Sequence, residues 1–256
     1  MTRLALIIVA ALAIGAGGDA TRLPSPAHIV VIVFENKDAS EINARSAPAM
    51  TALGLRYARL TNYFAATHPS LPNYLALVSG STHGITDDCT TCSVEGESIG
   101  DQLTRAGRSW AAYAEGFPSG AWFAKKHVPF LYFASGAIHV RPLLRLNPRR
   151  LPDFAFVVPN LCNDMHDCSV ATGDAWLKRF VAPLLGARNT IVFVVFDEGA
   201  GGNRVAAFAL GTAVRPHSVF TRRVDHYGLL ATIEDMFSLP RLGAAGAARP
   251  ITGIWR

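Results

Sequence analysis

Two uninterrupted apolar runs constrain the fold of this chain more than any other feature. Residues 28–34 read HIVVIVF and residues 190–196 read TIVFVVF, so β-branched and aromatic side chains fill nearly every position. A strand with one wet face alternates polar and apolar residues, whereas a strand covered on both faces does not. Both runs therefore predict parallel strands that are buried between two layers of helices.

The remainder of the chain alternates between strand and helix patterns. Further strands are predicted at residues 154–158 and 204–210, and helices at residues 72–79, 99–106, 172–185 and 226–237. The strand at 204–210 is expected to pair beside 190–196. This alternation predicts an α/β fold, a three-layer α/β/α sandwich with a mostly parallel sheet. The stretch 118–152 is rich in Pro, aromatic residues and Arg. We expect it to form an irregular excursion from the α/β fold near the functional site, not a second domain.

The first twenty residues form a separate unit. Arg3 precedes an apolar run from Leu4 to Ile14, and small residues continue to Ala20. This order is typical of a secretory signal peptide and is short for a membrane span. We therefore expect a signal peptide at residues 1–20, a mature domain at residues 21–256 and a periplasmic or extracellular protein. An uncleaved N-terminal anchor is the alternative.

The four cysteines form two local pairs, Cys89 with Cys92 and Cys162 with Cys168. In a reducing compartment such pairs could bind zinc, but in an exported chain disulfides are favoured. A redox C-x-x-C motif would follow a strand of the thioredoxin type, whereas residues 87–92 have a loop composition. We therefore predict two structural disulfides.

The chain carries 24 Lys and Arg against 19 Asp and Glu, a formal net charge of +5. This modest excess suits an anionic substrate or surface, but it lacks the dense basic stripe of a nucleic-acid-binding protein. No nucleic-acid partner is therefore expected. The arginines within 118–152 either steer anionic ligands or form a solvated basic face. The aromatic residues of this stretch either line a ligand site, rest on a membrane or simply pack. Transient membrane contact and the oligomeric state stay open.

Polar pairs follow directly after the two long apolar runs. Glu35 and Asn36 follow the first, and Asp197 and Glu198 follow the second. Ligands bind beyond the carboxyl ends of parallel strands, so these side chains are expected to meet. Three neighbouring carboxylates require a cation, and all-oxygen ligands favour Ca²⁺, Mg²⁺ or Mn²⁺ over Zn²⁺. The alternative is that both pairs lie in solvated turns without a metal. The occurrence of a polar pair after each of the two runs favours the metal site over this alternative.

The segment THPSLPNY at residues 67–74 is the second chemistry-bearing feature. Ser70 is predicted as the N-cap of the following helix, with Pro72 in the first turn. A hydroxyl at that position faces free N–H groups and the positive end of the helix dipole, which favours anion binding. A plain capping serine without chemistry is the alternative.

Six motifs occur in a characteristic order along the chain. They are FEN at 34–36, HPSxPNY at 68–74, KHxPF at 126–130, PNxCxDxHD at 159–167, FDEG at 196–199 and HYxLLxTIED at 226–235. Together they resemble the phosphoesterase family of bacterial and fungal acid phosphatases and bacterial phospholipases C, over roughly residues 28–241. The chain looks most like the short secreted acid phosphatases, which include members that act on phosphoinositides. The resemblance implies an alkaline-phosphatase-like fold.

The resemblance also implies residue roles. Ser70 corresponds to the nucleophile, and Asn73 would hold a phosphate oxygen. The ligands of one divalent metal ion would be Glu35, Asn36, Asp197, Glu198 and the Ser70 oxygen. Active-site histidines would be His127, His166 and His226. Asp164 and Asp167 would either orient His166 or shape the loop between two cysteines.

These roles imply a secreted metal-dependent acid phosphatase that hydrolyses phosphate monoesters of small molecules or lipid headgroups, including phosphoinositides. A serine hydroxyl needs a metal or a base to become nucleophilic, and it would form a phosphoserine intermediate. Histidines with a pKa near 6.5 donate protons best in mildly acidic solution, so an acidic optimum is predicted. The alternatives are a phosphodiesterase or phospholipase C activity at the same site and a catalytically silent secreted binding protein.

Overall fold

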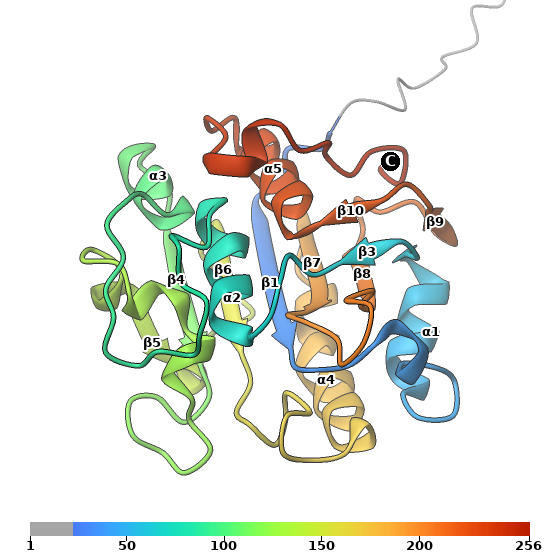
Figure 1. Cartoon of the computed structure of the whole chain (residues 1–256). Coiled ribbons are helices and arrows are strands. Elements are labelled where there is room, and N and C mark those ends of the chain that lie inside the picture. The colour runs from blue at the N-terminus through green and yellow to red at the C-terminus, as the bar shows by residue number, and fades with distance from the viewer. Residues whose placement is uncertain (1–22) are drawn as a thin grey trace, which may run out of the picture.

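The computed structural model describes residues 23–256, so the predicted signal peptide lies outside the described residues. At its centre is an eight-stranded sheet in the order β5-β4-β6-β1-β7-β8-β2-β9 (Figure 1). The strands are β1 (His28–Phe34), β2 (Ala58–Leu60), β4 (Trp110–Ala114), β5 (Val140–Pro142), β6 (Phe154–Val158), β7 (Thr190–Phe196), β8 (Ala207–Gly211) and β9 (Ser218–Phe220). All neighbours are parallel except β8, which runs antiparallel to β7 and β2.

Five α-helices cover the sheet within residues 23–256. They are α1 (Pro48–Arg56), α2 (Ser70–Ser79), α3 (Ile99–Arg105), α4 (Val170–Leu185) and α5 (His226–Phe237). Helix α2 packs against α5, and α1 packs against α4. Figure 1 shows α2 and α5 on the near face of the sheet and α4 on the far face. The strands β3 (Tyr63–Phe64) and β10 (Val224–Asp225) pair with each other outside the main sheet. The predicted α/β sandwich with a mostly parallel sheet is therefore confirmed.

The two central strands explain why their sequences do not alternate. Every side chain from Ile29 to Phe34 and from Thr190 to Phe196 is buried. Each large aliphatic or aromatic side chain removed from water contributes about 1.5–3 kcal/mol, so these strands form the centre of the core. A charged residue in the middle of either strand, such as Val194→Asp, would leave a buried charge without a partner.

Most predicted elements appear at or near their predicted positions. β1, β6, β7 and α5 match their predicted ranges, whereas the strand predicted at 204–210 is shifted to β8 at 207–211. The helices predicted at 72–79 and 172–185 each begin two residues earlier. Helix α1 and the short strands were not predicted. The strand β4 reads WAAYA and lacks β-branched residues, so its place between β5 and β6 is decided by pairing and not by propensity.

The predicted disulfides are present. Cys89 is bonded to Cys92 and Cys162 to Cys168, which accounts for all four cysteines of the chain. Among the helices that the structure describes, none has both the length and the apolar character needed to cross a membrane.

Glu234 is a buried carboxyl on α5 that makes stability depend on pH. Its Oε1 accepts a hydrogen bond from the N–H of Leu242 at 2.8 Å, while Oε2 has no partner among residues 23–256. Burial raises the pKa of Glu234 from 4.5 to about 8. The folded chain therefore keeps a proton that the unfolded chain loses above about pH 4.5, and the free energy of unfolding falls as pH rises through this window.

Glu234→Gln keeps the acceptor for Leu242 and removes the titrating group. We expect this variant to match the wild type at about pH 5 and to exceed its free energy of unfolding by a few kcal/mol at about pH 9. Urea denaturation at the two pH values measures the difference. An equal difference at both values would contradict the raised pKa.

Candidate active site

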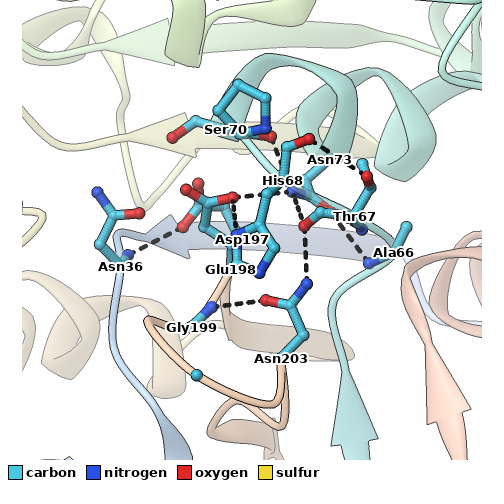
Figure 2. Close-up of polar contacts among 12 residues, drawn as sticks. Asn36, Ala66, Thr67, His68, Ser70, Asn73, Asp197, Glu198, Gly199 and Asn203 are labelled. Carbon is cyan, nitrogen blue, oxygen red and sulfur yellow. Dashed lines mark hydrogen bonds and ion pairs between the residues drawn. The ribbon is translucent and has the colours of Figure 1, made fainter. Parts of the chain in front are cut away.

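The carboxyl ends of β1 and β7 bring two carboxylates together. Phe34 is in register with Phe196, so Glu35 and Asp197 leave the sheet side by side, and both are fully buried. The backbone N–H of Asn36 donates to Asp197 Oδ1 at 3.0 Å (Figure 2). Asn36 has a φ of 53°, in the left-handed region that Asn tolerates better than most residues. Asn36 thus contacts Asp197 through its backbone.

Ser70 points at this carboxylate pair. Its Oγ donates to Glu35 Oε2 at 3.1 Å. Pro69 is the N-cap of α2 and Ser70 is its first helical residue. The Pro69 side chain makes no capping hydrogen bond to the helix. Instead, Asp88 Oδ1 accepts from the N–H of Leu71 at 3.0 Å. The predicted N-cap role of Ser70 is therefore wrong, and its hydroxyl is directed into the site.

The carboxylates of the site oppose one another electrostatically. Burial raises the pKa of Glu35 well above its usual value, and the charges of Asp197 and Asp164 add to this shift. Burial also raises the pKa of Asp197 to about 7 and that of Asp164 to about 7. Asp197 Oδ2 has no hydrogen-bond partner in the described part of the chain. Buried acids with an unpaired oxygen are the environment that a divalent cation neutralises, so these residues fit a metal ion.

His127 lies between two carboxylates on the other side of Glu35. Its Nε2 is 3.4 Å from Glu35 Oε1 and its Nδ1 is 3.3 Å from Asp164 Oδ2. The ring stacks on Tyr74, whose hydroxyl donates to Glu35 Oε1. Burial lowers the pKa of His127 well below 6.5, which favours the neutral ring.

Glu35, His127 and His166 form a second group that could hold a metal ion, because their ligand atoms lie within 4.8 Å of one another. Glu35 thus belongs both to an oxygen-rich set with Asp197 and to a set with two imidazoles. The first set favours a hard cation such as Mg²⁺ or Ca²⁺, whereas the second would also suit Zn²⁺ or Mn²⁺.

Two histidines of the site reach solvent. His166 Nδ1 is 2.6 Å from Asp167 Oδ1, and its side chain is 28% exposed. Asp164 contacts the backbone N–H of His166, so Asp167 is the residue that orients the ring. His68 Nδ1 is 2.9 Å from Glu198 Oε2, and its side chain is half exposed. The sequence prediction gave His68 no role, although its place two residues before Ser70 was a usable signal.

His226 is held as part of the frame of the site. Its Nε2 donates to the backbone carbonyl of Asp197 at 2.6 Å, and its Nδ1 accepts from the Tyr63 hydroxyl at 3.0 Å. Burial lowers the pKa of His226 to about 4. With both ring nitrogens engaged and no exposure to solvent, His226 is suited to positioning Asp197 and not to donating a proton.

Asn73 fastens the loop that precedes the nucleophile candidate. Its Oδ1 accepts from the N–H groups of Ala66 and Thr67, at 3.0 Å each. Its Nδ2 donates to the carbonyls of Thr67 and Pro69 and lies 3.4 Å from Glu198 Oε2 (Figure 2). These bonds engage both ends of the amide, so the geometry favours a positioning role over the predicted contact with phosphate.

The family model for the phosphoesterase family matches residues 39–240. The chain belongs to the phosphoesterase family. This confirms the family indicated by the six motifs and the predicted enzyme class, a hydrolase of phosphoric esters.

Two curated relatives show how far the likeness extends. Phosphatidylinositol-3-phosphatase of Mycobacterium tuberculosis is 37% identical, over 93% of this phosphoesterase and 86% of the relative. Phosphate-repressible acid phosphatase of Penicillium chrysogenum is 31% identical, over 72% of this chain and 53% of its own length. The phosphoesterase therefore spans most of the mycobacterial relative and about half of the fungal one.

Solved structures with low sequence identity share the fold. A protein of the alkaline phosphatase superfamily from Vibrio parahaemolyticus superposes with a TM-score of 0.68 at 14% identity, covering 89% of this phosphoesterase and 70% of that chain. Phosphonate monoester hydrolase from Silicibacter pomeroyi gives 0.63 at 11% identity, with 88% and 76% covered. The alkaline-phosphatase-like fold implied by the motifs is thereby confirmed.

Proposed function

We propose that this phosphoesterase is a secreted, metal-dependent acid phosphatase that hydrolyses phosphate monoesters through a phosphoserine at Ser70. The observation that carries the proposal is the hydrogen bond from Ser70 Oγ to Glu35, within a buried carboxylate cluster that fits a cation. The names of the relatives, an acid phosphatase and a phosphatidylinositol-3-phosphatase, support a phosphorylated small molecule or lipid headgroup as substrate. The signal-peptide pattern and the two disulfides support export.

Glu35, Asp197 and Glu198 would hold the divalent cation, with the Asn36 amide as a further ligand candidate. When bound, such an ion lowers the pKa of a neighbouring hydroxyl and polarises a phosphoryl oxygen. Glu35 Oε2 already accepts the Ser70 hydroxyl hydrogen bond and is placed to take its proton.

Ser70 Oγ attacks phosphorus in line, so that the serine–phosphorus bond forms as the bond to the leaving oxygen breaks. We assign the proton donor for that oxygen to His166, because its ring is oriented by Asp167, reaches solvent and lies within 4.8 Å of the Glu35 carboxylate. Water then attacks the phosphoserine from the vacated side and gives a proton to His166, while Glu35 returns its proton to the Ser70 oxygen as the serine–phosphorus bond breaks.

The test compares p-nitrophenyl phosphate with bis-p-nitrophenyl phosphate from about pH 4 to pH 9, after dialysis against a chelator and with or without divalent ions. We expect metal-restored hydrolysis of the monoester, greatest at acidic pH. In His166→Asn the loss should be larger for an alkyl phosphate than for p-nitrophenyl phosphate, since the poorer leaving group needs the proton more. Preference for the diester would favour a phospholipase C type of activity. Inactivity of the folded, metal-loaded protein on both substrates would count against the proposed function.

A further inference from the structure

The net positive charge of the chain resides in one segment. Residues 116–152, which we call the basic excursion, contain six Lys and Arg residues and no Asp or Glu. The whole chain has 24 basic and 19 acidic residues, so the part outside the basic excursion has 18 basic residues and is slightly acidic. Such asymmetry creates a local positive field that attracts anionic surfaces.

The same segment exposes large apolar side chains. Leu144 is 97% exposed, Ile138 72% and Trp122 49%. Elsewhere in residues 23–256, the exposed large apolar side chains are Leu55 and Val219, at 49% and 44%. Leu144 lies between Arg141 and Arg145 in the sequence and buries almost no apolar surface, so it contributes little to the stability of the fold.

Trp122 and Leu144 lie beyond the carboxyl ends of the parallel strands, at the same end of the sheet as the candidate active site. Leu144 lies two residues after the end of β5, and Trp122 lies eight residues after the end of β4. Both strands run parallel to β6 and β1, whose carboxyl ends lead into the loops that contain Asp164 and Glu35. The backbone carbonyl of Trp122 accepts from the N–H of Leu161, which lies in the loop that contains Asp164 and His166. Figure 1 shows β5 at one end of the sheet, so its outer side pairs with no described strand.

We propose that Trp122, Arg141, Leu144 and Arg145 form a docking patch for an anionic phospholipid bilayer. Aromatic and aliphatic side chains insert into the interfacial region, while arginines neutralise lipid headgroups. Separate apolar tips beside the exposed Arg141 and Arg145 fit a fluid anionic interface better than the contiguous apolar face of a protein partner. Presentation of lipid headgroups to Ser70 rests on the proposed function, whereas binding to the bilayer does not.

The test is co-sedimentation of the mature protein with vesicles of an equimolar mixture of phosphatidylcholine and phosphatidylglycerol, compared with vesicles of phosphatidylcholine alone. The wild type should bind only the anionic vesicles, and added salt should weaken binding. Arg141→Gln with Arg145→Gln should weaken binding about 25-fold, roughly fivefold for each arginine. Leu144→Asp should weaken it about tenfold.

Two matched controls lie away from the docking patch. Val219→Asp makes the same kind of change on β9, the opposite edge strand, and Lys178→Gln with Arg179→Gln removes two exposed charges from α4. Both controls should bind like the wild type, and all variants should hydrolyse p-nitrophenyl phosphate at the wild-type rate. Failure of the wild type to bind anionic vesicles, or equal loss in patch variants and controls, would overturn the proposal. Normal vesicle binding by a protein without phosphatase activity would refute the proposed function and leave the docking patch standing.

Discussion

Ser70→Ala is expected to lower turnover of phosphate monoesters by about 10⁴-fold or more while the variant keeps the wild-type fold. The hydroxyl donates to Glu35 and caps no helix end, so its removal takes away the nucleophile without loosening α2. The N–H of Leu71 keeps its bond to Asp88, which is independent of the serine.

The measurement is steady-state hydrolysis of p-nitrophenyl phosphate, together with acid trapping of radiolabelled phosphoprotein. The wild type should retain label that is absent from Ser70→Ala. Ser79→Ala is the matched control, because it removes a hydroxyl from the other end of the same helix, where Oγ bonds only to nearby backbone and to His83. A folded Ser70→Ala protein with wild-type turnover would rule out the phosphoserine mechanism.

Asp197→Asn is expected to abolish metal binding and to reduce turnover by more than about 10³-fold. The Asn side chain can still accept from the N–H of Asn36, so the end of β1 keeps its anchor. The anionic charge that a cation needs is lost. A bound ion that is present at roughly 100 times its dissociation constant stabilises the fold by about 2.7 kcal/mol, and this increment should vanish in the variant.

In metal-free protein, Asp197→Asn should not lower the stability and should raise it at high pH. The pKa of Asp197 is raised to about 7 by burial, so without metal the folded state loses stability as pH rises from about 4 towards 7. Metal-free Asp197→Asn should therefore melt at the same temperature as the metal-free wild type or above it at about pH 8, while only the wild type gains from added ion. Thermal unfolding with and without divalent ions measures both effects. The control is Asp153→Asn, which directly precedes β6 at the amino ends of the parallel strands. An ion-dependent increase in melting temperature that persists in Asp197→Asn would place the metal elsewhere.

The sequence was sufficient for the central sheet and for the meeting of Glu35 with Asp197. The runs at 28–34 and 190–196 lack alternation because both faces are covered, and a polar residue after such a strand has one exit, the carboxyl edge. The lack of alternation and the polar residue after each strand are properties of short segments. They can be recognised without knowing which strands pair with which. The short strands β2, β5 and β9 could not be predicted in this way, because three residues carry too little pattern and their pairing depends on distant chain segments.

What only the tertiary structure decided is the direction of each polar side chain within the motifs. Local sequence placed Ser70 at a helix start, but Asp88, from a loop eighteen residues away, satisfies the helix end and leaves the serine to face Glu35. Likewise His226 carries an active-site motif, and its two ring nitrogens are engaged by Tyr63 and the Asp197 carbonyl. The chain by itself determined which residue types gather at the carboxyl edge. Hydrogen bonds between segments far apart in the sequence decided which of them hold the frame and which remain free to react, because a polar group once buried must be satisfied by whatever the fold brings beside it.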